Sequence, residues 1–153
     1  MKTDQEKWQV IDYEVQMYFA TRKLRQHSSF QNPTPERGLL LNAIIESEGL
    51  HTRNLCEFCL SKVKGDIQLQ SLVSDEEWKA LEPLVTKLHA AYGIRDNPDS
   101  PRMILNQMLM HPTDRRGPSY TYNAVFSILH PKLDEIIAKL RLVDGRFVLP
   151  VIA

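Results

Sequence analysis

Three helix-start signals divide this chain and limit it to helical segments joined by loops. Thr34 and Ser100 each come directly before a proline, so each can cap a helix whose first position is occupied by that proline. Ser74 is followed three residues later by Glu77, which is the spacing of a capping box. No stretch alternates apolar and polar residues convincingly enough to predict a strand. We therefore expect an all-α, up-and-down bundle of four to five helices.

The five expected helices are separated by recognisable breaks. Gly65 supplies a stop for the second helix, while Pro83 predicts a kink or a break inside the third and Pro131 predicts a kink inside the fifth. Residues 66–73 leave room for one helical turn or a short extended piece. The apolar residues from Phe147 onward are expected to pack on the core or on a partner. The expected helices span residues 4–26, 34–64, 74–92, 100–111 and 119–142.

Length and charge limit the number of domains and the kinds of partner that we expect for this protein. With 153 residues, one domain over residues 1–153 is expected, and it is large enough to bury a core without disulfides. Nineteen Lys and Arg balance nineteen Asp and Glu, so the basic excess typical of duplex-binding domains is absent. The first residues contain no apolar signal segment, and no stretch has the length and apolarity of a membrane span. These features predict a cytoplasmic protein without a membrane segment.

The second expected helix carries an unusual group of polar residues within its apolar stripe. Glu48, His51, Arg53 and Asn54 lie where a helix that only packs would have leucine or isoleucine. A buried polar group without a partner costs roughly 1–3 kcal/mol, so these side chains need partners if they are buried. We expect either a buried hydrogen-bond network or a functional site. For Arg53 the expected partner is Glu46 or Glu48, and its replacement by alanine is expected to cost about 2–4 kcal/mol.

Two short patterns in the same helix resemble metal-binding motifs. Cys56 and Cys59 form a C-x-x-C, but they lie deep in a helix and no second such pair supplies further zinc ligands. We expect both to be reduced core thiols without metal. Glu48 and His51 form an E-x-x-H, which di-iron bundles use in two copies together with two further glutamates. A single copy makes these two residues weak metal candidates, and no metal ion is expected.

A basic cluster follows the fourth expected helix. His111, Thr113, Arg115 and Arg116 could bind a phosphate, stabilise an oxyanion or transfer protons, or could form a solvated loop. Because the sequence contains no P-loop and no G-x-G-x-x-G, it predicts no cradle for a nucleotide cofactor, and no cofactor is expected.

Together these segments resemble a family pattern. Residues 46–58 read E-S-x3-H-x-R-N-L-x2-F, and residues 111–116 read H-x-T-x2-R after a helix that ends at His111. This combination resembles small bacterial all-α proteins similar to HEPN domains (higher eukaryotes and prokaryotes nucleotide-binding). The resemblance implies a helical bundle in which His51, Arg53, Asn54 and His111 converge. Arg22 and His27 match the R-x4-H motif of the ribonucleases in this superfamily, but at the end of the first helix instead of the start of a late one.

The resemblance implies one main function and leaves two alternatives open. The main expectation is a HEPN-like interaction module, associated with nucleotide or RNA, that forms a homodimer or binds a protein partner, as in defence or toxin–antitoxin systems. The first alternative is a metal-independent endoribonuclease that uses His51 and His111 with Arg53 and Arg116. The second is a metal-binding bundle. The candidate site residues are His51, Arg53, Asn54, His111 and Arg116.

Overall fold

Helix is the regular secondary structure of this protein throughout the part that the structure describes. The computed structural model describes residues 2–27, 34–94, 97–110, 122–143 and 146–147, and these contain six helices and no strand. The expected all-α fold is thus confirmed. The helices are α1 (Asp4–Arg25), α2 (Pro35–Leu60), α3 (Leu69–Leu72), α4 (Asp75–Tyr92), α5 (Pro101–Met110) and α6 (Tyr122–Leu140).

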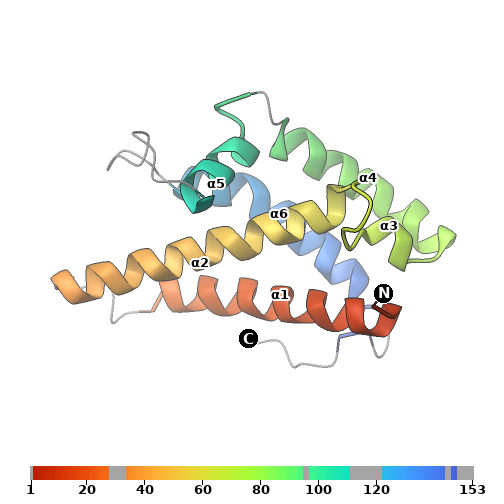
Figure 1. Ribbon diagram of the computed structural model, residues 1–153, viewed down its shortest axis with the longest axis horizontal. Helices are drawn as coiled ribbons and strands as arrows, with labels where there is room; N and C mark the ends of the chain where they lie inside the picture. Colours follow the sequence, from red (N-terminus) through yellow and green to blue (C-terminus); the bar gives the residue numbers. More distant parts are fainter. Residues whose placement is uncertain (1, 28–33, 95–96, 111–121, 144–145, 148–153) are drawn as a thin grey trace.

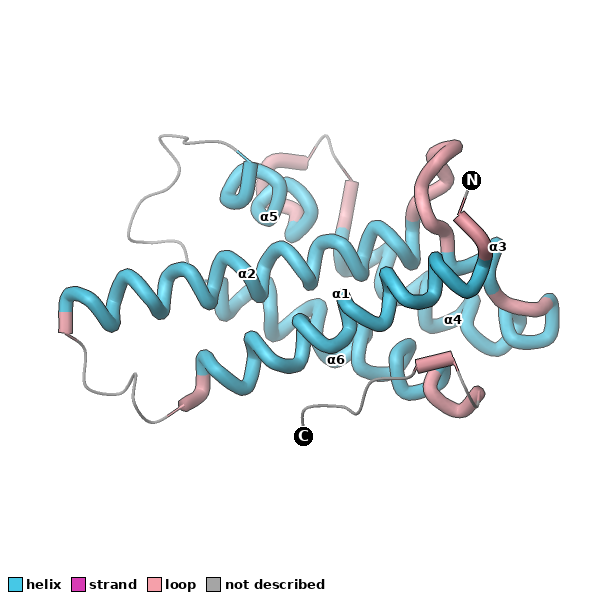
Figure 2. Tube along the Cα trace, turned by 60° about the horizontal axis from the view of Figure 1, so that its bottom comes forward, coloured by secondary structure: helices cyan, strands magenta, loops and turns pink. Residues whose placement is uncertain are grey.

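Helix α2 lies at the centre of this arrangement. It runs antiparallel to α1 along most of that helix, and it also contacts α4, α5 and α6 (Figure 1). Helices α4 and α6 pack against each other behind α1 and α2 in the view of Figure 2. The amino-terminal end of α2 extends beyond the other helices, as both views show. This central position explains how polar residues of α2 can meet partners from several helices.

The expected helix starts are confirmed by hydrogen bonds at each cap. The hydroxyl groups of Thr34 and Ser74 accept hydrogen bonds from backbone N–H groups in the first turns of α2 and α4, and Glu77 completes the capping box. The Ser100 hydroxyl does the same for α5 by accepting from the Met103 N–H. These contacts satisfy backbone donors that the helices themselves leave unpaired.

The end of α2 differs from the expected boundary. The helix stops at Leu60 instead of residue 64, and Ser61 is extended at the C-cap with ψ of 139°. The Ser61 hydroxyl accepts from the Val63 N–H at 3.1 Å and donates to Asp66 at 2.5 Å. A serine that bonds to nearby groups in this way offers the backbone an alternative to the helix. The expected stop at Gly65 therefore lies within a turn after the helix.

The two internal prolines are accommodated within continuous helices. Pro83 lies inside α4 and Pro131 inside α6, so neither divides its helix into separate elements. Of the two alternatives expected for Pro83, a kink or a break, the break is therefore wrong. Pro83 is exposed. The last helix was expected to start at residue 119, and residues 119–121 lie outside the described residues.

The core is formed by the apolar faces of the five longer helices. On α1 the apolar residues recur at helical spacing: Ile11, Val15 and Tyr18 are buried and Trp8 packs beside them. Phe147, just after α6, packs edge-to-face on Trp8 with ring centroids 5.9 Å apart. Phe147 therefore packs on the core as expected, and the rest of that apolar tail, residues 148–153, lies outside the described residues. In the described parts of the chain, no helix combines the length and apolarity that crossing a membrane requires.

Both cysteines lie in this core as free thiols. Burial raises the pKa of Cys59 to about 12 and the pKa of Cys56 well above its usual value. Because the thiolate is the reactive form, we predict that neither thiol of the folded protein reacts with Ellman's reagent at pH 8. Both should react once urea unfolds the chain. Rapid labelling of one thiol in the folded protein would contradict the burial of the pair.

Candidate functional site

The polar residues in the middle of α2 divide into two clusters with different partners. The inner cluster consists of Arg25, Glu48, Thr52, Asn123 and His130, and it joins α1, α2 and α6. The outer cluster consists of Glu14, His51 and Asn54, and it joins α1 to α2.

The inner cluster is centred on a fully buried carboxylate. Glu48 has no exposed surface, and it receives two hydrogen bonds from the Arg25 guanidinium, from Nε at 2.6 Å and from Nη2 at 3.2 Å. Arg25 Nη1 also donates to Asn123 at 3.0 Å. A guanidinium that binds both oxygens of a carboxylate forms the strong, bidentate kind of ion pair. This pair therefore ties the end of α1 to the middle of α2.

His130 completes the inner cluster as a neutral side chain. The Thr52 hydroxyl donates to the Glu48 backbone oxygen at 2.7 Å, so His130 Nε2, 3.2 Å from that hydroxyl oxygen, is the donor to it. Burial lowers the pKa of His130 to about 3, and the nearby positive charges of Arg22 and Arg25 add to this effect. The ring also stacks on Phe126, with centroids 4.8 Å apart. At neutral pH this histidine therefore carries no charge.

The acidity of Glu48 reflects two opposing effects. Burial raises its pKa, while the hydrogen bonds and the charge of Arg25 lower it, and burial is the larger effect. A neighbouring network continues from this cluster along α1 and α6, where Arg22 and the Tyr18 hydroxyl both donate to Asp134, at 2.7 and 2.9 Å. Burial raises the pKa of Tyr18, so its hydroxyl keeps its proton. The polar groups of the inner cluster and of this neighbouring network thus hydrogen-bond to one another, as in a structural network.

The outer cluster is organised by a residue that the sequence pattern did not indicate. Glu14 Oε2 lies 2.7 Å from His51 Nδ1 and accepts a hydrogen bond from Asn54 Nδ2 at 3.2 Å. The ring of Tyr13 meets the His51 ring edge-to-face at 5.9 Å. His51 is buried in this arrangement. Sequence spacing places Glu14 in the first helix. The spacing does not indicate which residues of that helix contact α2.

Arg53 has a different partner from the one expected. Its Nε donates to the side-chain oxygen of Asn106 on α5 at 2.5 Å, while Glu48 pairs with Arg25. The expected partner of Arg53 was Glu46 or Glu48. The structure instead pairs Arg53 with Asn106, so this expectation is wrong. Arg53 is half-buried, and the loss of stability expected from its replacement by alanine stays a prediction.

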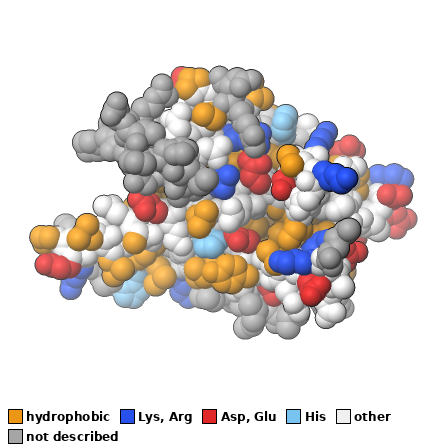
Figure 3. Space-filling model, viewed as in Figure 1, with side chains coloured by type: hydrophobic (Ala, Val, Ile, Leu, Met, Phe, Trp, Pro, Cys, Tyr) orange, Lys and Arg blue, Asp and Glu red, His pale blue; other side chains and the backbone are white. Residues whose placement is uncertain are grey.

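Next to the outer cluster lies a cavity of about 350 Å³ between α1, α2 and the loop after α2. One of its carboxylates, Glu57, accepts hydrogen bonds from Tyr92 and Arg102 at 3.0 and 2.9 Å. On the face drawn in Figure 3, acidic, basic and hydrophobic side chains gather over this part of α1 and α2. The cavity is lined by Val10, Ile11, Glu14, Arg53, Asn54, Glu57, Phe58, Asp66 and Ile67.

The weak metal candidates do not share a site. Glu48 bonds to Arg25 and His51 bonds to Glu14, although three residues separate them on one helix. Within the described residues, no three His, Cys, Asp or Glu side chains lie close enough together to hold a metal ion.

The second half of the candidate site lies outside the described residues. This applies to His111, Thr113, Arg115 and Arg116, so their convergence with His51 and Arg53 stays a prediction. Of the R-x4-H pair, Arg22 binds Asp134. His27 is exposed just after α1.

An apolar surface lies at the other end of α2. Ile45 packs against the core, and we define the residues of α2 that precede it, 35–44, as the projecting segment. Within it Leu39 is 73% exposed and Leu40 is 55% exposed. Hydrophobic side chains cover this end of the helix in Figure 3. Leu24, in the last turn of α1, is also half exposed.

Comparison with known proteins adds no relative to this picture. No family model matches the chain, and no curated protein or solved structure matches it. The HEPN-like resemblance therefore rests on the sequence patterns of residues 46–58 and 111–116.

Proposed function

We propose that this chain is a HEPN-like helical interaction module that forms a homodimer through the projecting segment of α2. The observation that carries the proposal is the exposure of Leu39 and Leu40 on a helix that extends beyond the rest of the bundle (Figure 1). The sequence resemblance would place such a module among defence or toxin–antitoxin proteins.

The projecting segment has the composition of a helix that is covered by another surface. Leu39, Leu40 and Leu41 are consecutive, and successive residues of a helix point about 100° apart, so these side chains cover more than half of its circumference. An apolar surface of this extent on a helix is normally covered by another surface. Burying a leucine side chain contributes about 1.5–3 kcal/mol, so several leucines from two copies supply a substantial driving force.

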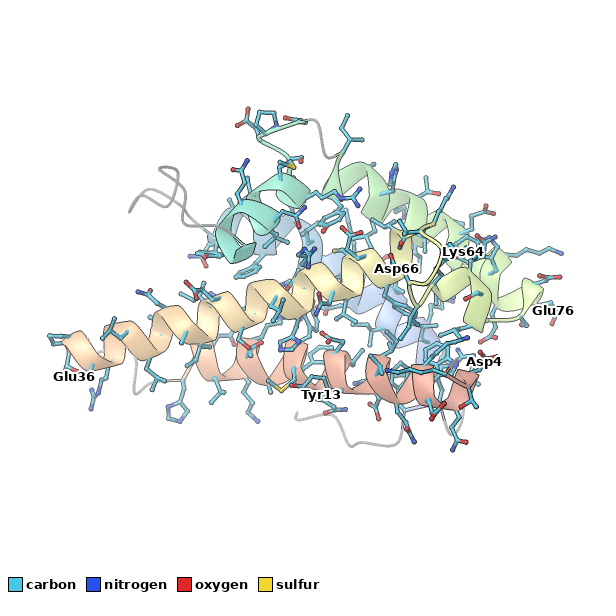
Figure 4. All side chains as sticks on the ribbon, viewed as in Figure 1. Asp4, Tyr13, Glu36, Lys64, Asp66 and Glu76 are labelled. Atoms are coloured by element: carbon cyan, nitrogen blue, oxygen red, sulfur yellow. The ribbon has the colours of Figure 1, made fainter. Side chains whose placement is uncertain are left out.

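A second copy of the chain is the partner that the charge distribution favours. The net charge is zero with neutral histidines, so two copies do not repel each other at long range. In a symmetric dimer the same apolar segment would serve both subunits, as two-fold symmetry requires. Glu36, labelled at the end of α2 in Figure 4, and Arg37 give this segment one charge of each sign.

The polar centre of α2 supports a structural role more than a catalytic one. His51 is buried against Glu14, and His130 is neutral and committed to Thr52. The cavity next to the outer cluster carries one arginine and three carboxylates on its walls, which disfavours a polyanionic RNA backbone. A ribonuclease would instead require a positively charged cleft that contains both histidine and arginine.

Changing the projecting segment should abolish dimer formation. We expect sedimentation equilibrium to give a dimer mass for the wild type and a monomer mass for the Leu39→Glu, Leu40→Glu variant. The dissociation constant of the dimer should rise by at least about tenfold, because two charges per subunit would enter an apolar interface. Circular dichroism should show that the variant keeps its helix content, since both residues lie outside the core.

A matched control separates this interface from general surface apolarity. Leu142 is 77% exposed just after α6, so Leu142→Glu makes the same chemical change elsewhere and should leave the dimer intact. A wild type that stays monomeric over the whole concentration range would refute the proposal. RNA cleavage by the wild type that disappears in a folded His51→Ala variant would favour the endoribonuclease instead.

A further inference from the structure

The cavity between α1 and α2 has walls of three chemical kinds. Residues 53, 54, 57 and 58 of α2 share one helical face, residues 10, 11 and 14 of α1 share another, and the two faces meet across the cavity. Asp66, labelled in Figure 4, closes one side from the loop that follows α2. The cavity thus offers a cation, carboxylates and apolar groups within one small volume.

The cation is held in place but lacks an anionic partner. Arg53 Nε is anchored by Asn106, and within the described chain its two terminal nitrogens have no hydrogen-bond acceptor. Three carboxylates line the same cavity, yet none of them forms an ion pair with this guanidinium. A fixed guanidinium fork matches the two oxygens of a carboxylate.

On the opposite wall, the Glu14 carboxylate uses only one of its two oxygens in hydrogen bonds with the described residues. Glu14 Oε2 interacts with His51 and Asn54, whereas the described residues supply no donor to Glu14 Oε1. That oxygen can accept a hydrogen bond from an ammonium group. Glu57 differs, because Tyr92 and Arg102 occupy both of its oxygens and Arg102 neutralises its charge.

The remaining walls provide an apolar surface. Ile11 and Phe58 are buried, and Val10 and Ile67 are half-buried beside them. The volume of about 350 Å³ lies near the lower end of the range for ligand pockets, which runs from about 300 to 1,000 Å³. It accommodates a small molecule with one branched or aromatic side chain.

We propose that this cavity binds a small zwitterion of the α-amino-acid class with an apolar side chain. The ligand carboxylate binds the terminal nitrogens of Arg53, its ammonium group binds Glu14, and its side chain lies against Ile11 and Phe58. A nucleotide fits less well, because its phosphates would bring several negative charges next to Glu14 and Asp66. This site is separate from the projecting segment, so the inference does not depend on the proposed dimer.

Isothermal titration calorimetry with a matched set of ligands tests the proposal. L-leucine and L-phenylalanine are expected to bind the wild type at least about tenfold more tightly than 4-methylpentanoate or 3-methylbutylamine, each of which retains one charge. Adenosine monophosphate serves as the nucleotide probe. Saturable binding of adenosine monophosphate alone, or no saturation by either amino acid up to about 10 mM, would overturn the proposal.

Variants assign the two polar contacts separately. Arg53→Met and Glu14→Gln should each weaken L-leucine binding by at least about tenfold, whereas Asp66→Asn at the exposed rim should change it by less than about threefold. Unchanged binding in Arg53→Met would contradict the assignment. Melting curves check that each variant folds. Val10→Trp, which fills the cavity from a half-buried position, provides a further variant and should also abolish binding.

Discussion

Replacing Arg25 with methionine is expected to lower the free energy of unfolding by about 3–5 kcal/mol at pH 7. The reason is that Glu48, which is fully buried, would lose the guanidinium that binds both of its oxygens. Removing one partner of a buried ion pair leaves an uncompensated charge in the protein interior. Urea unfolding followed by circular dichroism measures the change.

Two comparisons make this prediction specific. Lys7 forms an ion pair with the exposed Asp4 on the same helix, so Lys7→Met should cost less than about 1 kcal/mol. Replacing both Arg25 and Glu48 with methionine should recover most of the loss, because an apolar pair needs no charge compensation. Equal losses in Arg25→Met and Lys7→Met would contradict the buried pair.

The loss in Arg25→Met should also depend on pH. Burial raises the pKa of Glu48 and Arg25 lowers it, so the pKa rises further when Arg25 is removed. Glu48 would then hold a proton in the folded variant at pH values at which the unfolded chain has released it. The destabilisation should therefore be smaller at pH 5 than at pH 8. The opposite trend would show that Glu48 is not the source of the effect.

Acidification is expected to destabilise the wild type through His130. Its pKa is about 3 in the folded protein, against 6.5 as the ordinary value. The unfolded chain therefore binds a proton that the folded chain does not, and stability is lost as the pH falls below about 6.5. The slope for one such group reaches about 1.4 kcal/mol per pH unit.

A non-titrating variant isolates this contribution. His130→Gln retains a donor to the Thr52 hydroxyl but carries no charge at any pH. Between pH 7 and pH 4.5, the free energy of unfolding should fall by about 2 kcal/mol more in the wild type than in the variant. Other titrating groups act on both proteins, so the difference reports on His130. Parallel curves, or an NMR titration of His130 with a midpoint near 6, would refute the prediction.

Local signals in the sequence predicted the all-α fold correctly. Thr34, Ser74 and Ser100 cap helices because their hydroxyl groups reach backbone donors only two or three residues away. The buried residues of α1 recur at helical spacing, a pattern that the sequence carries by itself. The end of α2 was missed because the Ser61 hydroxyl and Asp66 form a local turn that competes with the helix before Gly65.

The partners of the polar residues were decided by the tertiary structure. The sequence indicated that Glu48 and His51 would need partners, but those partners, Arg25 and Glu14, lie on another helix. Two residues three positions apart on α2 point in directions that differ by about 60°, and helix packing determines what each direction meets. For the same reason the sequence alone could not pair Arg53 with Asn106.

The sequence by itself determined which segments are helices and which faces are apolar, because both depend on neighbours within one or two turns. The closed inner cluster and the cavity beside Arg53 depend on how four helices pack, so only the tertiary structure decided them.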